Sequence, residues 1–218
     1  MRDTTRRHET TIRGGAASSL RRGAQVAALL SLAIGCSDPA GTPRVDAAVN
    51  DGPVLVDGGG CVSAIEEHPE EGALHIPCTG PTNFLTVPPS SGNHYPKWPD
   101  YKTYDAPVPW GNLVHALEHG AIVIVYNCPD GCADEVARAQ SFIDALPIDS
   151  FCEAPDSRRV ILAPDPTLPS DVRWAASAWT WTLRAPCFSE DAFATFVSDH
   201  YGHGREATCV ELHAPLCP

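Results

Sequence analysis

Two short aliphatic runs stand out from a chain that is otherwise polar and rich in proline. One covers residues 121–126 (AIVIVY) and the other residues 159–163 (RVILA). Runs of this length with many β-branched side chains are typical of strands that are buried on both faces. We therefore expect both strands at the centre of a sheet. Residues 172–183 carry three Trp and two Thr, a composition that favours a further strand over a helix.

Apolar residues at helical spacing predict two helices. In residues 133–146 the apolar side chains recur every three or four positions, acidic residues occupy the first turn, and Pro147 stops the pattern. A second helix is predicted after Ser189, which is a suitable N-cap, with Phe193 and Phe196 on its inner face. Residues 77–109 have many prolines and little apolar periodicity, so we expect a long ordered loop there. These elements predict an α+β fold, with α/β as the alternative: a small mixed sheet with two or three helices, braced by disulfides.

The first 35 residues have the features of a signal peptide. Six arginines are followed by an apolar run, residues 24–34, that is too short to span a bilayer. Its end, residues 32–36 (LAIGC), resembles the lipobox of bacterial lipoproteins, which implies that Cys36 is acylated. The alternative is an ordinary secretory leader. We expect residues 1–35 to be the signal peptide, 36–60 a disordered tether, and 61–218 a single globular domain.

The cysteines also indicate export. Without Cys36 an even set of eight remains, which fits four disulfides, and no C-x-x-C pair of a zinc ribbon is present. Their pairing cannot be deduced from the sequence: a local bridge in a turn and separate distant partners are both open for the C-x-x-x-C pair at 128 and 132. We expect a cell-envelope lipoprotein that faces the periplasm or lies at the outer membrane. The eight are Cys61, Cys78, Cys128, Cys132, Cys152, Cys187, Cys209 and Cys217.

The charge of the chain excludes one class of partner. The formal net charge is −12, and it becomes −16 once six arginines and two acidic residues leave with the leader. Such a surface repels nucleic acid and anionic lipid headgroups. We therefore expect no nucleic-acid partner and membrane attachment through the lipid alone. The sequence gives no basis for naming a protein partner.

The segment LVHALEHG at residues 113–120 carries the most suggestive chemistry. His115 and His119 are four residues apart, so a helix would place their Cα atoms about 6 Å from each other, whereas a strand would separate them by about 13 Å. Two imidazoles can share a metal ion only in the first case. A metal site therefore requires a helix of about two turns that ends near Gly120.

Upstream, residues 88–98 read PPSSGNHYPKW and include His94, and His75 precedes them. Together with LVHALEHG, this stretch resembles a bacterial family of domains of unknown function that is marked by PPxSGxHxPxW and LVHxLEHG. The resemblance covers about residues 71–206 and implies that the motif histidines are His75, His94, His115 and His119. It implies little about function, and the cysteines depart from the family pattern.

Four histidines brought together by a loop and a short helix predict a transition-metal site, for zinc or copper. The single Met is Met1, so a thioether site for cuprous copper is excluded. Residues 115–119 also read H-x-x-E-H, which makes Glu118 a candidate catalytic base of a metal-dependent hydrolase or oxidoreductase, or a carboxylate that orients a histidine. A third hypothesis is a structural or interaction module with a histidine network in its core. The sequence leaves open whether the protein is an enzyme.

Overall fold

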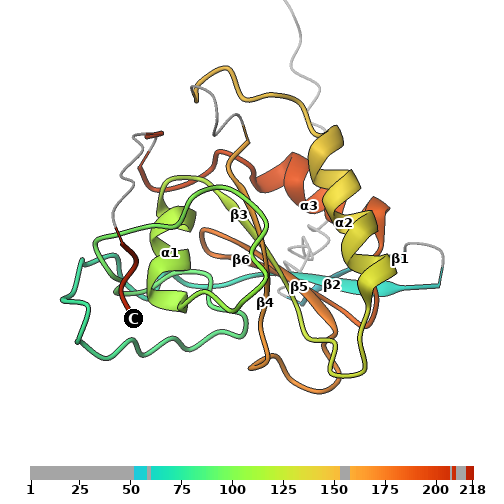
Figure 1. Cartoon of the computed structure of the whole chain (residues 1–218), viewed down its shortest axis with the longest axis horizontal. Helices are drawn as coiled ribbons and strands as arrows, with labels where there is room; N and C mark the ends of the chain where they lie inside the picture. Colours follow the sequence, from blue (N-terminus) through green and yellow to red (C-terminus); the bar gives the residue numbers. More distant parts are fainter. Residues whose placement is uncertain (1–51, 58–59, 153–157, 207, 210–214) are drawn as a thin grey trace, which may run out of the picture. The chain divides into compact units, whose positions relative to one another are not determined.

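The computed structural model describes residues 52–57, 60–152, 158–206, 208–209 and 215–218. The predicted signal peptide, the predicted lipidation site Cys36 and most of the predicted tether lie outside these residues. Within the described part, six strands and three helices form an α+β domain, as predicted (Figure 1).

The strands form one mixed sheet in the order β1-β2-β6-β5-β3-β4. All neighbours are antiparallel except β3 and β4, which are parallel because a helix connects them along the chain. The strands are β1 (Val54–Asp57), β2 (Val62–Glu67), β3 (Ile122–Tyr126), β4 (Val160–Pro164), β5 (Trp174–Ala178) and β6 (Trp181–Ala185).

Both aliphatic runs are strands, but the prediction that both are central is wrong for β4, which lies at one edge of the sheet. A loop covers this edge and hides the strand from solvent. The Tyr104 amide donates to the Leu162 carbonyl at 2.8 Å, and the Leu162 amide donates to the Lys102 carbonyl at 3.2 Å. An aliphatic run indicates that a strand is buried but not that it is central. Here the loop covers the edge of β4 as a further strand would.

The helices cover opposite faces of the sheet. Helices α2 (Ala133–Ala145) and α3 (Glu190–His200) pack against one face with Trp174 and Phe188 (Figure 1). Helix α1 (Trp110–Glu118) packs against the other face together with the proline-rich loop. The predicted cap is present, since the Ser189 Oγ accepts a hydrogen bond from the Ala192 amide at 3.4 Å. The sheet therefore separates one hydrophobic core, which it forms with α2 and α3, from a second, which it forms with α1.

Strand β1 occupies part of the range that we predicted to be a tether. It pairs with β2 from Val54 opposite Ile65 to Asp57 opposite Val62. Val54 and Leu55 are exposed, at 61% and 66%, and Val56 alone of its apolar side chains packs, half-buried, against the core. Backbone pairing along β2 holds it in place, which is why the sequence pattern did not reveal it.

Four disulfides are present, the number that the even cysteine count predicted. One is the local bridge Cys128–Cys132, and the other three join segments that are far apart in the chain: Cys61–Cys187, Cys78–Cys217 and Cys152–Cys209. This disulfide content is typical of an extracellular or periplasmic protein. Among the residues that the structure describes, no helix is long and apolar enough to cross a membrane.

Candidate metal centre

Backbone pairing between two loop segments places His75 beside His94. The two residues form an isolated parallel bridge, in which the Ile76 amide donates to the His94 carbonyl at 2.8 Å and the His94 amide donates to the Leu74 carbonyl at 3.0 Å. The imidazole centroids of His75 and His94 lie 4.9 Å apart. His94 is fully buried, whereas the His75 side chain is 46% exposed. The proline-rich loop thus presents the inner imidazole, His94, and the segment just before the loop presents the outer one, His75.

Helix α1 supplies the other two members of the cluster, His115 and Glu118. They are three residues apart and lie on the same side of the helix, so the helix that a metal site requires at this position is present. The loop approaches the helix closely at Gly111, where a Cβ atom would lie 2.4 Å from the Tyr95 ring. The chain leaves the helix at Gly120, which has φ of +79°.

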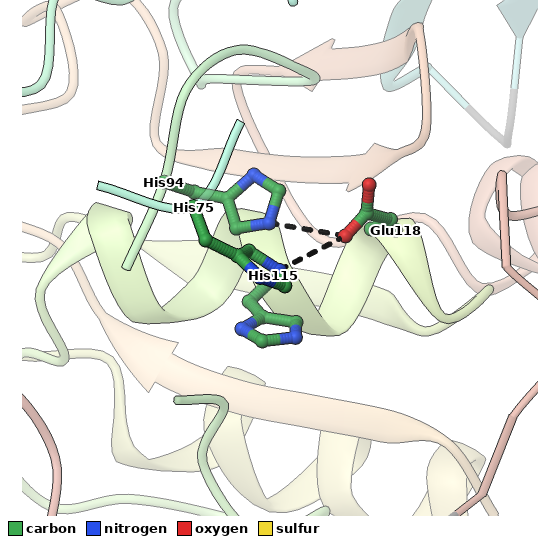
Figure 2. A group of neighbouring side chains, drawn as sticks. All are labelled: His75, His94, His115 and Glu118. Carbon is green, nitrogen blue, oxygen red and sulfur yellow. Dashed lines mark hydrogen bonds and ion pairs between the residues drawn. The ribbon is translucent and has the colours of Figure 1, made fainter. Parts of the chain in front are cut away.

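Figure 2 shows how the four side chains converge. One ligand atom from each of His75, His94, His115 and Glu118 lies within 4.8 Å of the others. Glu118 Oε2 is 3.1 Å from His94 Nε2 and 3.5 Å from His75 Nε2. The ring centroids of His75 and His115 are 4.5 Å apart. Three imidazoles and one carboxylate therefore surround one small volume, a group that could hold a metal ion.

Backbone carbonyls orient two of the imidazoles. The His94 Nδ1 lies 2.8 Å from the Gly92 carbonyl, and the His115 Nδ1 lies 2.7 Å from the Tyr95 carbonyl. A carbonyl oxygen only accepts, so each Nδ1 carries the proton and donates it. In the neutral ring the lone pair is then on Nε2, which for His94 faces Glu118. This is the arrangement that typically orients metal-binding histidines in proteins.

Burial keeps these imidazoles neutral. The pKa of His115 is lowered from 6.5 to about 3, mainly by loss of solvation and in smaller part by the neighbouring histidines, against the opposing effect of the hydrogen bond to the Tyr95 carbonyl. Burial also lowers the pKa of His94, although the carbonyl of Gly92 and the Glu118 carboxylate both oppose the shift. A neutral imidazole is the form that binds a metal ion, so no proton has to be displaced from these rings near neutral pH.

His119 lies beside the cluster and is not one of the four converging residues. Its ring is 4.8 Å from the His115 ring and 4.6 Å from the Trp98 ring, centroid to centroid. Its Nδ1 is 3.9 Å from Glu206 Oε2. Burial lowers the pKa of His119 to about 4, against the opposing effect of Glu206. Trp98 thus covers both helical histidines, and His119 faces the chain after α3.

Sequence reasoning assigned Glu118 to catalysis or to orienting a histidine, and did not include it among the ligands. The available signal was its spacing, since Glu118 follows His115 by three residues and therefore shares its side of a helix. A second group of possible ligands comprises Asp149, Cys152 and Cys209. The two cysteines form a disulfide and Asp149 pairs with Arg159, so this group offers no free thiolate.

The fold and the cluster define a disulfide-braced α+β domain with a candidate centre of three histidines and one glutamate. Residues 75–211 match the family described as "Protein of unknown function (DUF3105)", and the chain belongs to this family. The predicted membership in a family of unknown function is confirmed. Neither the curated proteins nor the solved structures include a match to the chain.

Proposed function

We propose that this protein is a lipid-anchored cell-envelope protein that binds a divalent transition metal ion through His75, His94, His115 and Glu118. The anchor is the acylated Cys36, and the membrane is reached through this lipid alone. Residues 36 to about 51 serve as the tether. The disulfides support an exported domain, and the convergence of the four side chains supports the metal site.

The observation that carries the proposal is the position of one carboxylate oxygen. Glu118 Oε2 lies within 3.5 Å of two imidazole nitrogens, and both Glu118 and His94 are almost completely shielded from water. Since the His94 Nδ1 proton is used by the Gly92 carbonyl, the neutral ring turns a lone pair toward a carboxylate. Two acceptors that face each other in a buried site require a cation between them.

A metal ion fits between them, and so does a proton, carried either by His94 or by Glu118. Protonation of His94 is opposed by burial, which lowers its pKa despite the neighbouring carboxylate. A metal ion satisfies both groups and also uses the Nε2 lone pair of His115. A structural network of hydrogen bonds would leave that lone pair without a donor from the other three side chains. The metal site therefore accounts for more of the geometry than a structural core does.

The donor set favours zinc or copper. Imidazole and carboxylate ligands suit zinc and cupric copper, and the eight cysteines are held in disulfides. The net charge of −16 that remains without the leader attracts cations toward the protein. We assign His119 to the packing around the centre, because Glu118 and not His119 converges with the other ligands.

Metal-dependent catalysis is the second candidate, and the exposure of His75 favours it. With 46% of this side chain exposed, a small molecule can reach the metal from solvent. A hydrolase or an oxidoreductase would fit such access. Glu118 then acts as a ligand, because its carboxylate lies against two imidazole nitrogens and is not free to serve as a base.

Metal content tests the proposal. We expect the full-length protein, purified in mild detergent with its disulfides intact, to carry about one metal ion per chain by elemental mass spectrometry. His115→Ala and Glu118→Gln should each lose most of this metal, since each removes a buried ligand. His68→Ala is the matched control, because His68 is half-buried, contacts Thr182 Oγ1 at 2.8 Å and lies outside both the cluster and the chain that packs against α1.

Two other results would count against the site. Equal metal loss in His68→Ala would indicate binding that does not depend on the cluster. A parent protein that stays metal-free after incubation with zinc, copper and nickel salts would support the structural or interaction module instead.

A further inference from the structure

The end of α1 that carries Glu118 is held by chain segments far away in the sequence. The last carbonyls of a helix have no partner within the helix. Here the Glu118 carbonyl accepts from the Glu206 amide at 2.8 Å, and the Gly120 carbonyl accepts from the Gly202 amide at 2.9 Å. The carbonyl between them, that of His119, accepts from the Arg159 guanidinium. Three successive carbonyls are thus satisfied from outside.

Residues 202–206, which follow α3 and which we call the 202–206 strap, lie directly against this helix end. A Cβ atom at Gly204 would be 2.3 Å from the Glu118 carbonyl oxygen and 2.2 Å from the Gly120 amide nitrogen. Only glycine allows this approach. The strap therefore contacts the backbone of α1 itself, at the residue whose carboxylate belongs to the candidate metal centre.

The strap and Arg159 are fixed at a second point. Arg159 is buried and pairs with Asp149 at 3.0 Å, and the Tyr201 hydroxyl donates to the same carboxylate at 3.0 Å. The Cys152–Cys209 disulfide joins the Asp149 loop to the chain three residues beyond Glu206. The partners of the α1 carbonyls thus belong to one connected group of charged, hydrogen-bonded and disulfide contacts.

We propose that the 202–206 strap positions Glu118 for metal binding, and that the amide of Glu206 is the contact through which it acts. This inference rests on the proposed metal site. Glu118 is the last residue of α1, and helix ends fray when their carbonyls lack partners. A metal ion tolerates only small displacements of its ligands. The strap removes the freedom of the helix end and keeps the carboxylate beside His94.

The experiment compares two substitutions at one position of the full-length protein. Glu206→Pro removes the amide donor, and Glu206→Ala keeps it while removing the same carboxylate. Zinc affinity is measured by competition with a chromogenic chelator, and the absorption spectrum of the cobalt-loaded protein reports the ligand geometry. We expect Glu206→Pro to weaken zinc binding about 10- to 100-fold and to alter the cobalt spectrum, as is typical when groups that orient ligands are lost. Glu206→Ala should stay close to the parent in both measurements.

A stability control separates positioning from general loosening. Ile143→Ala truncates a buried side chain on α2, on the other face of the sheet, and should lower Tm without changing the cobalt spectrum. Should Glu206→Pro fail to fold, the Cys152→Ser, Cys209→Ser double variant takes its place, because it frees the far end of the strap without touching α1. We expect it to weaken zinc binding as well.

The outcomes distinguish this inference from the proposed function. A parent that binds zinc, together with equal affinities for Glu206→Pro and Glu206→Ala, overturns the strap and leaves the metal site standing. An Ile143→Ala protein with the altered cobalt spectrum of Glu206→Pro overturns it too. A parent without zinc overturns both.

Discussion

At the scale of residues, the chemistry of the centre depends on which nitrogen of each imidazole is free. His94 and His115 each give the Nδ1 proton to a backbone carbonyl of the loop, so the loop conformation selects the tautomer. The ligand atoms are thereby fixed by residues that do not belong to the cluster. A change in the loop near Gly92 or Tyr95 should therefore weaken metal binding although it removes no ligand.

The lowered pKa values of the histidines predict acid sensitivity of the metal-free protein. In the folded state the pKa of His115 is about 3 and that of His119 about 4, whereas both return to 6.5 on unfolding. Between these values the unfolded chain binds protons that the folded protein excludes, so the free energy of unfolding falls as the pH drops. This contribution is complete above pH 6.5 and is lost progressively toward pH 4 and below.

Urea unfolding in the presence of a chelator, from about pH 7.5 to about pH 4.5, measures this slope. His119→Phe keeps a ring against Trp98 but cannot bind a proton, so its stability should depend less on pH in this range. An unchanged slope in His119→Phe would contradict the assignment of the acid sensitivity to this histidine.

At the scale of elements, α1 is a short helix whose two ends are both anchored by remote chain. The 202–206 strap holds its C-terminal end, and the segment near the C-terminus of the chain holds its first turn. The Asn112 side-chain Nδ2 donates to the Cys217 backbone carbonyl at 2.9 Å, and the Cys217 backbone amide donates to the Asn112 Oδ1 at 3.3 Å. A helix of nine residues is marginal by itself, so such contacts and its packing determine its stability.

Asn112→Ala should therefore destabilise the protein more than an ordinary polar substitution. It leaves the amide and the carbonyl of Cys217 without partners in a buried place, which costs about 2 kcal/mol or more. Thermal unfolding with the disulfides intact measures the effect. Asn127→Ala is the matched control, because Asn127 is half-buried and its side chain makes one bond, to the Leu168 carbonyl at 3.2 Å. Equal losses in the two variants would contradict this role of Asn112.

At the scale of the whole molecule, the sheet organises the two hydrophobic cores and the disulfides hold the irregular segments. The sheet separates the core of α2 and α3 from the core that carries α1. Three long-range disulfides join segments that contain little regular structure: Cys61–Cys187 beside β2, Cys78–Cys217 between the loop and the end of the chain, and Cys152–Cys209 behind the strap. The long loop that bears His94, and the segment before it that bears His75, are thus fixed covalently at Cys78.

The disulfides should differ in their contributions to stability. Replacing Cys61 and Cys187 by serine opens a loop that spans 126 residues, whereas replacing Cys128 and Cys132 opens one that spans 4. From chain entropy we expect the free energy of unfolding to fall by up to about 5 kcal/mol without Cys61–Cys187 and by about 2 kcal/mol without Cys128–Cys132. Urea unfolding of the two double variants measures both values. A larger loss for the short bridge would show that local strain or packing outweighs chain entropy here.

Local patterns in the sequence were sufficient for most of the regular elements. The aliphatic runs predicted β3 and β4, helical periodicity predicted α2 and α3, and Gly120 marked the end of α1. Each of these signals is contained in a few neighbouring residues, because side-chain periodicity follows directly from backbone geometry. Strands β1 and β2 were missed, since β1 has an exposed pattern and β2 buries Ser63 where an apolar residue would have given a signal. The single strand predicted at residues 172–183 is two antiparallel strands, β5 and β6.

The membership of the candidate centre required the tertiary structure. Around the axis of a helix, Glu118 lies roughly 60° from His115 on one side and His119 roughly 40° from it on the other. The spacing alone therefore makes both residues neighbours of His115. The packing of Trp98 and Glu206 beside His119, and of His94 beside Glu118, decides between them. The sequence by itself determined β3, β4, α2 and α3, the place of the short helix and the number of disulfides. The cysteine pairing, the meeting of His75 with His94 and the choice of Glu118 depend on contacts between distant segments, which no local pattern encodes.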